Sequence, residues 1–413
     1  MKRKVIAVVS LLLAGSVCGG CVSVPSFDAH VNSTVKSYRF SVAGWQYRTI
    51  TQQLAQGVRE RDEKIESGVE EVVEYFTLVD RINTLKSQMR ASSNGSVPGD
   101  SASLEAELKQ LQERQAILAG TVETVIRNQA REILAKHGIF HPLDRYIKVK
   151  ANFPPLNLKL EKPPYLLVIS PRERIETIRT TLLRQDITVP VMEEIEAGVD
   201  GLGVSSLVVE LGGLGATYPT LVTSEASLRF VLDTAAHEWL HQYLVFSPLG
   251  FRYLLDITGI ARNYEIATMN ETVADIVGKE VSDAAIAEYY PDNENGSQPK
   301  ETAASEFDFD REMREIRKAV DQYLARGEVE AAERFMEEKR QYLVGKGYYI
   351  RKLNQAYFAF HGKYADRPAY LSPIGIELKE LRAQSASLKD FLDTVAGMTS
   401  RQDLKLALKK APR

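Results

Sequence analysis

His237, Glu238 and His241 form a His-Glu-x-x-His sequence, the most informative feature of this chain. The chain has only six His among 413 residues, so two of them at this spacing around a Glu stand out from background. Positions i and i+4 share one face of a helix, so both imidazoles can direct a ring nitrogen at one ion. Glu238 would lie beside that ion, where it could take a proton from metal-bound water and pass it to a leaving amine.

A second acidic motif, Asn270-Glu271 followed by Asp275, supplies the remaining parts of a catalytic metal site. Glu271 is the predicted third ligand, and three protein ligands leave the open coordination position that catalysis needs. Asp275 is one helical turn further on, where it could hydrogen-bond the free ring nitrogen of a ligand His and fix its tautomer. The expected cofactor is Zn²⁺. The alternative is a pair of ordinary helix histidines without a metal.

Two helices are expected to position these side chains. Apolar residues recur at helical spacing between Phe230 and Leu244, around the first motif. The segment 270–280, which carries the second motif, has the same character. A metal site requires rigid supports of this kind.

Together the two motifs resemble those of the gluzincin group of zinc metallopeptidases, which includes thermolysin-like enzymes and zinc aminopeptidases. The resemblance implies hydrolysis of peptide bonds in a peptide or protein substrate, with Glu238 as general base and Asp275 behind a ligand. The separation of His241 from Glu271 is longer than is usual in the group. The insert 245–269 contains Pro248 and two glycines, and we expect it to loop out without moving the second helix.

The resemblance also implies a downstream His or Tyr that stabilises the oxyanion formed during hydrolysis. His361 is the only His after the metal motif and is the first candidate. Tyr357 or Tyr349 could take the same role, and Tyr253 and Tyr264, inside the insert, are weaker candidates. The alternative for His361 is a cap at a helix C-terminus, where its charge would be favourable.

Three features bear on the type of activity. Zinc aminopeptidases hold the substrate amine with an acid in a Gly-rich motif, but the segment 212–215 has no acid and Glu210 precedes it. Residues 216–219 could form a sheet edge that pairs with an extended substrate, or an ordinary hairpin. The sequence does not decide between an endopeptidase and an exopeptidase. The alternatives to the predicted zinc peptidase are a zinc aminopeptidase, another zinc hydrolase, or a non-enzymatic cell-envelope scaffold that retains the zincin fold.

Residues 1–21 read as an export leader. Basic residues precede an apolar stretch, 5–17, that is too short for an ordinary membrane span. Cys18 and Cys21 are the only cysteines, so no internal disulfide framework can form in the mature protein. Gly-Gly-Cys21 resembles a bacterial lipoprotein cleavage site, with Cys18 where Leu is usual. We expect an exported cell-envelope protein, lipid-anchored at Cys21 on the periplasmic or extracellular face of a membrane. Ordinary cleavage, or retention as a short anchor, are the alternatives.

Composition and patterning predict an α+β, mostly helical fold. The net charge of -3 gives no basic excess and argues against nucleic acid as a partner. We expect a helical hairpin region in 30–145, a zincin-like catalytic core with a small β-sheet in 146–289, a loop in 290–306 and a C-terminal helical subdomain in 307–413. The oligomeric state does not follow from the sequence.

Individual elements are expected within these regions. The hairpin helices should cover 49–85 and 103–136, as a packing element or, alternatively, as a partner-binding arm or cap. Strands are predicted at 165–169, 187–192 and 205–211. C-terminal helices are predicted at 309–325, 328–344, 348–361, 374–383 and 387–396.

Overall fold

The computed structural model describes residues 27–57, 68–93, 101–142, 152–215, 217–291, 307–361 and 373–410. Within these ranges, 14 α-helices and two three-stranded sheets confirm the mostly helical α+β class. No helix in the same ranges is long and apolar enough to cross a membrane. The predicted leader with Cys21, most of the 290–306 loop and Ala216 lie outside the described residues.

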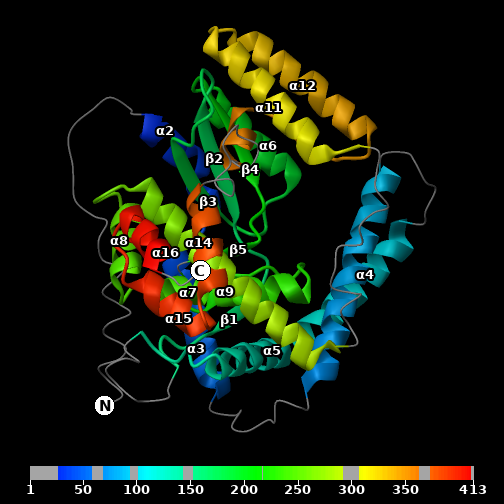
Figure 1. The fold of residues 1–413 in the computed structure, drawn as a ribbon. Helices are drawn as coiled ribbons and strands as arrows, with labels where there is room; N and C mark the ends of the chain where they lie inside the picture. Colours follow the sequence, from blue (N-terminus) through cyan, green and yellow to red (C-terminus); the bar gives the residue numbers. More distant parts are fainter. Residues whose placement is uncertain are drawn as a thin grey trace.

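Most of the elements along the chain are helices (Figure 1). The helices are α2 (Phe27–Val35), η2 (Lys36–Tyr38), α3 (Val42–Gly57), α4 (Val69–Ser93), α5 (Ser101–Lys136), α6 (Val189–Asp200), α7 (Leu228–Leu244), α8 (Pro248–Ile257), α9 (Tyr264–Tyr289), α11 (Phe309–Ala325), α12 (Val329–Gly345), α13 (Gln355–Phe360), α14 (Pro373–Gln384), α15 (Leu388–Ala396) and α16 (Arg401–Lys410). The strands are β1 (Leu158–Leu160), β2 (Tyr165–Pro171), β3 (Arg179–Leu183), β4 (Val204–Val209), β5 (Gly213–Leu214) and β6 (Thr220–Val222).

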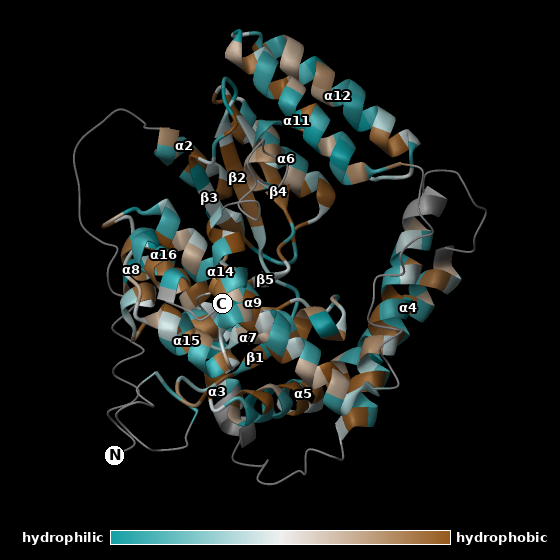
Figure 2. Ribbon diagram, viewed as in Figure 1, coloured by the Kyte–Doolittle hydropathy of each residue, from teal (hydrophilic) through white to brown (hydrophobic). Residues whose placement is uncertain are grey.

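The larger sheet has the antiparallel order β3-β2-β4, with β2 in the centre. Leu167 and Ile169 of β2 pack with residues of α2 and α6 on one face. Val168 packs with Leu207 and with Ala356 of α13 on the other face. Because both faces are covered, successive residues of β2 are apolar, and Figure 2 shows the strand as largely hydrophobic.

Two of the three predicted strands, 165–169 and 205–211, are confirmed as β2 and β4. The predicted strand at 187–192 is wrong, because α6 begins at Val189. Pro190 lies in the first helical turn, where the missing N–H costs no intrahelical hydrogen bond. The β-branched residues around Pro190 suggested a strand, whereas the residues of this helix that are buried, Met192, Ile195 and Val199, recur at helical spacing.

The predicted helix over 348–361 is wrong in its first half. Only Gln355–Phe360 is helical, as α13, and Asn354 caps it by accepting a hydrogen bond from the backbone N–H of Tyr357. The residues before Asn354 form no helix, and two of them, Arg351 and Lys352, make ion pairs with α6. Ion pairs with a helix far away in the sequence, together with the packing of Ile350 and Leu353 in a hydrophobic cluster, therefore hold this segment in place.

The metal motifs lie on α7 and α9, which pack against each other inside the main hydrophobic core. The helix pair α4 and α5 packs on this core through α5, which contacts α7, α9 and β1. Gln115 of α5 donates to the Ser224 carbonyl at 2.7 Å, and Lys86 of α4 pairs with Glu225 at 2.6 Å. These contacts agree with a packing role for the predicted hairpin. Within the predicted 49–85 helix the structure describes α3 up to residue 57 and α4 from residue 69, and residues 58–67 lie outside the described residues.

The smaller sheet has the order β1-β6-β5 and leads directly into α7. β1 is parallel to β6, and β5 is antiparallel to it. The outer edge of β5 pairs with no strand among the described residues. Residues 217–219, part of the segment predicted as a sheet edge, are not in a strand, so the edge strand is the preceding β5.

Candidate metal centre

Helix α7 presents the first motif from a buried scaffold. Ser227 caps its start by accepting a hydrogen bond from the backbone N–H of Phe230. The apolar face of the helix is buried in the main core, including Trp239, whose indole N–H donates to the Pro154 carbonyl at 2.7 Å. His237 and His241 lie on the opposite side, with 18% and 15% of their side chains exposed. Both histidines are therefore rigidly held and still reachable from solvent.

The structure brings His237, His241 and Glu271 together as one group that could hold a metal ion. The Nε2 atoms of the two histidines are 3.1 Å apart. Glu271 Oε2 lies 3.4 Å from Nε2 of His237 and 3.6 Å from Nε2 of His241. Ligand atoms in a tetrahedral site with bonds of about 2.0–2.2 Å lie about 3.3–3.6 Å from one another. The two distances from Glu271 lie in this range, and the distance between the two Nε2 atoms is only about 0.2 Å below it, so the three atoms are close to the separations that a small tetrahedral ion requires.

Each histidine is oriented by a hydrogen bond to its other ring nitrogen. Asp275 Oδ1 lies 3.0 Å from Nδ1 of His237, the contact expected from the sequence. Nδ1 of His241 lies 2.6 Å from the side-chain oxygen of Asn270. Because both partners accept, Nδ1 of each ring carries a proton, and in the neutral imidazole the lone pair is therefore on Nε2, which faces the cluster.

Asn270 has no role in the sequence-based prediction, although it belongs to the second motif. It is fully buried, and α9 places it one residue before the ligand Glu271, against His241. The sequence did contain one indication of this role, which is a polar side chain among the apolar residues of the helix. Its function became apparent only from the packing of α9 on α7.

A glycine permits the close approach of α9 to α7. A Cβ atom on Gly278 would lie 2.5 Å from Asp233 Oδ1, 2.9 Å from the Asp233 carbonyl and 3.3 Å from Cβ of His237. Any larger residue would push the helices apart at the level of His237. Gly278 therefore helps to hold the candidate ligands of the two helices close together.

The charges in the cluster favour a cation between its members. Burial disfavours the charged form of His237, but its hydrogen bonds with Asp275 and Glu271 prevail and raise its pKa to about 10. Burial would raise the pKa of Glu271, yet hydrogen bonds with His237 and His241 bring it well below its usual range. The acids that stabilise a proton on His237 would stabilise a metal cation in the same way.

Glu238 lies beside the ligands and is half-buried. Burial raises the pKa of its carboxyl, while the neighbouring His237 and His241 act in the opposite direction. A carboxylate with a raised pKa is a stronger base than a fully solvated one. The position and basicity of Glu238 are those of a group that can accept a proton near the cluster.

The insert between the motifs contains helix α8, where the sequence predicted a loop. Tyr253 of α8 stacks on His241 with ring centroids 5.3 Å apart, and its hydroxyl donates to Glu271 Oε1. That bond occupies one carboxylate oxygen and leaves Oε2 facing the histidines. Tyr253, a weak candidate from sequence, thus directly contacts a metal-ligand candidate.

The other oxyanion candidates lie on different elements. His361 and Tyr357 lie together, with ring centroids 4.3 Å apart, on and just after α13, which packs on β2 and β4. Tyr349 and Tyr264 have 67% and 65% of their surfaces exposed. The structure does not group these side chains with the three ligand candidates, and their role in stabilising an oxyanion stays a prediction.

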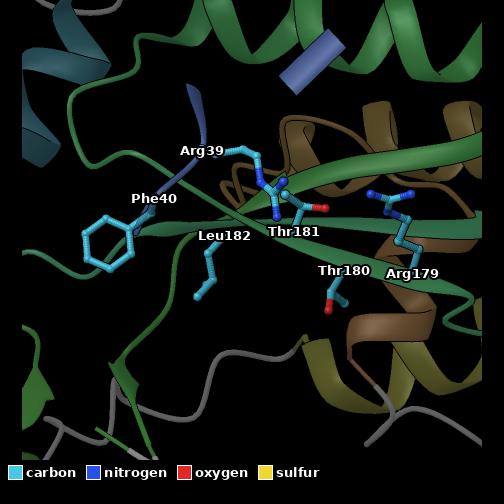
Figure 3. Close-up of a pocket in the computed structure, with 6 residues that line it drawn as sticks. All are labelled: Arg39, Phe40, Arg179, Thr180, Thr181 and Leu182. Carbon is cyan, nitrogen blue, oxygen red and sulfur yellow. The ribbon is translucent and has the colours of Figure 1, made fainter. Parts of the chain in front are cut away.

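A separate hollow of about 340 Å³ lies at the outer edge of β3 (Figure 3). It is lined by Arg39, Phe40, Arg179, Thr180, Thr181 and Leu182. Arg179 is already paired with Asp28 and Asn32. The hollow includes none of the metal-ligand candidates and is distinct from the cluster on α7 and α9.

Comparison with known proteins adds no relative to this description. No family model, no curated protein and no solved structure matches the chain.

Proposed function

We propose that this protein is a zinc-dependent peptidase that hydrolyses peptide bonds with Glu238 as general base. The observation that carries the proposal is the convergence of two Nε2 atoms and one carboxylate oxygen at mutual distances of 3.1–3.6 Å, with Glu238 beside them. Two imidazoles and one carboxylate form a donor set that suits zinc at a catalytic site. A structural zinc site would instead have four protein ligands.

The residues divide the chemical work between them. Zinc, when bound, would lower the pKa of water and polarise a carbonyl group. Glu238 accepts the proton of the attacking water and returns it to the leaving amine. Asp275 and Asn270 keep the two imidazoles in the tautomer that points Nε2 at the ion. Tyr253 keeps Glu271 in place through its Oε1 atom.

The free edge of β5 supports a peptide as the substrate. The backbone N–H of Thr223 donates to the Gly212 carbonyl, and Gly213 is paired with Val222 one step along. In an antiparallel ladder, bonded and non-bonded pairs alternate, so the Gly213 backbone groups face the open side. An extended peptide could pair with these groups as an added strand.

The cellular setting of this proposal rests on the sequence alone. We propose that the chain is exported and held at a membrane surface by lipid attached to Cys21. A peptidase in that place would act on peptides or proteins outside the cytoplasm. Metabolic labelling with a fatty acid, lost in Cys21→Ser, tests the attachment.

Glu238→Gln tests the catalytic assignment. The variant keeps the size of the side chain but cannot accept a proton, so hydrolysis of a peptide library should fall by about 10²–10⁴-fold. Bound zinc, measured by elemental analysis, should be unchanged. Glu333→Gln, on α12 and outside the cluster, is the matched control and should retain activity. Full peptidase activity of Glu238→Gln, or wild-type protein without zinc, would overturn the proposal.

A further inference from the structure

The edge strand β5 follows helix α7 closely at positions occupied by glycine. A Cβ atom on Gly212 would lie 2.8 Å from Cζ of Phe230, and one on Gly213 would lie 3.5 Å from Cγ2 of Thr234. Phe230 and Thr234 are four residues apart and share one face of α7. The strand therefore runs along the helix toward the metal motif.

The next residue on the same face is Glu238, and Gly215 lies against it. A Cβ atom on Gly215 would lie 2.3 Å from Oε2, 2.8 Å from Cδ and 2.9 Å from Oε1 of Glu238. Every atom of the carboxylate is thus within the space that an alanine methyl group would occupy. Such approaches are shorter than real Cβ contacts allow, so an alanine would force the carboxylate to move.

We propose that Gly215 is a positioning residue for Glu238: its missing side chain lets the carboxylate lie against the end of the edge strand, beside the metal ligands. The expected effect on catalysis rests on the proposed function. The close contact between Gly215 and Glu238 does not depend on it. The arrangement places the proton acceptor next to the free strand edge on which a peptide backbone would lie. General-base catalysis is sensitive to such placement, because a shift of about 1 Å can lower the rate by about 100-fold.

Gly215→Ala tests the catalytic part. We expect kcat to fall by about 10–100-fold, with KM and bound zinc little changed, because the added methyl group displaces only Glu238. The matched control is Gly120→Ala on α5, where an added Cβ would meet nothing within 4 Å and activity should be unchanged. Glu238→Asp withdraws the carboxylate by one methylene, so it should lower kcat less in the Gly215→Ala background than in the wild type. If Glu238→Asp lowers kcat by the same factor in both backgrounds, the proposal is overturned.

A stability measurement separates this inference from the proposed function. Gly215→Ala should lower the melting temperature only slightly, because the group that must move is the end of a flexible side chain, and Glu238→Ala should abolish that loss in the double variant, since it removes the atoms that clash. This cycle needs no enzymatic activity. If the wild-type protein hydrolyses no peptide but the stabilities are coupled, the proposed function fails and the contact remains. If Gly215→Ala changes neither kcat nor melting temperature, the positioning role is wrong.

Discussion

Two clusters of partly buried charge in this protein differ in how their carboxylates are neutralised. The ion-pair cluster consists of Glu196 and Asp200 of α6 with Arg351 and Lys352, which precede α13. The metal-ligand cluster consists of His237, Glu238, His241 and Glu271. In the first cluster every acid has an Arg or Lys partner. In the second, within the part of the chain that the structure describes, Glu271 makes ion pairs only with histidine, and Glu238 has no Arg or Lys partner.

The difference indicates what each cluster does. Arginine and lysine carry permanent charge, so the ion-pair cluster is complete and serves to fasten α6 and the segment before α13 to the sheet. Histidine can be neutral and then offers a lone pair, so the metal-ligand cluster can exchange its proton for a metal ion. The first cluster should therefore matter for stability, and the second for metal binding and activity.

The largest effect is expected from Arg351→Met. Arg351 makes two bonds to Glu196, at 2.6 and 2.9 Å, and only 3% of the Glu196 side chain is exposed. Removal of the guanidinium leaves a buried charge without its main partner and should lower the free energy of unfolding by about 3–5 kcal/mol. Denaturant unfolding measures the loss, and zinc affinity in the folded protein should not change.

The control is the double variant Glu196→Gln with Arg351→Met. It removes both charges and should recover a large part of the lost stability, because the cost arises from the unpaired carboxylate. If Arg351→Met also lowered the affinity for zinc, the two clusters would be coupled. That result would contradict the assignment of stability to one cluster and metal binding to the other.

The sequence predicted the metal-ligand cluster far better than the ion-pair cluster, for a physical reason. His237, Glu238 and His241 are joined by helical spacing, a local property that the chain displays directly. Arg351 and Glu196 are far apart in the sequence, and nothing local marks them as partners. The predicted strand at 187–192 and the predicted helix at 348–361 failed in the two segments that this cluster connects. Tertiary contacts there outweigh local propensity.

Within the metal site the same limit applies. The roles of Asn270 and Tyr253 depend on how α9 and α8 pack against α7, which no spacing in the sequence specifies. Helix α8 was expected to be a loop because of Pro248 and the glycines around it. Pro248 instead begins the helix, as Pro commonly does in a first turn. The three candidate ligands and the contact of Asp275 with His237 could thus be predicted, but the contacts of Asn270 and Tyr253 could not.

Bound zinc should stabilise the folded protein by a smaller amount, and this stabilisation should depend on the metal-ligand cluster and not on acids that are paired with arginine. A ligand at 100 times its Kd stabilises the folded state by about 2.7 kcal/mol, if it does not bind the unfolded chain. We expect that gain in the wild type and little or none in Glu271→Ala, which lacks one of three ligands. Glu333→Ala, which removes an acid paired with arginine, should retain the full gain. Thermal unfolding with and without zinc measures both, and equal gains in the two variants would contradict the ligand assignment.

The smallest effect concerns pH and an acid paired outside either cluster. Glu333 of α12 accepts two hydrogen bonds from Arg172, at 2.7 and 2.8 Å, and these bonds hold its pKa below the usual 4.5. A lowered folded-state pKa stabilises the protein above the unfolded value, and that stability is lost as the pH falls through the folded value. Because a third of the Glu333 side chain is exposed, the contribution at neutral pH should be only about 0.5–1 kcal/mol.

Glu333→Gln should therefore lower the free energy of unfolding at neutral pH, and its difference from the wild type should shrink below pH 4.5. Glu123 of α5 supplies a control of opposite sign, because burial outweighs its contact with Lys159 and raises its pKa. The folded protein then favours the protonated form, so the wild type should gain stability relative to Glu123→Gln as the pH falls. Denaturant unfolding at neutral pH and below pH 4.5 measures how the stability of each variant, relative to the wild type, changes with pH. If the stability differences of both variants from the wild type change with pH in the same direction, the ion pair with Arg172 does not control the pKa of Glu333. The distinction between acids that have an Arg or Lys partner and acids that do not would then lose support.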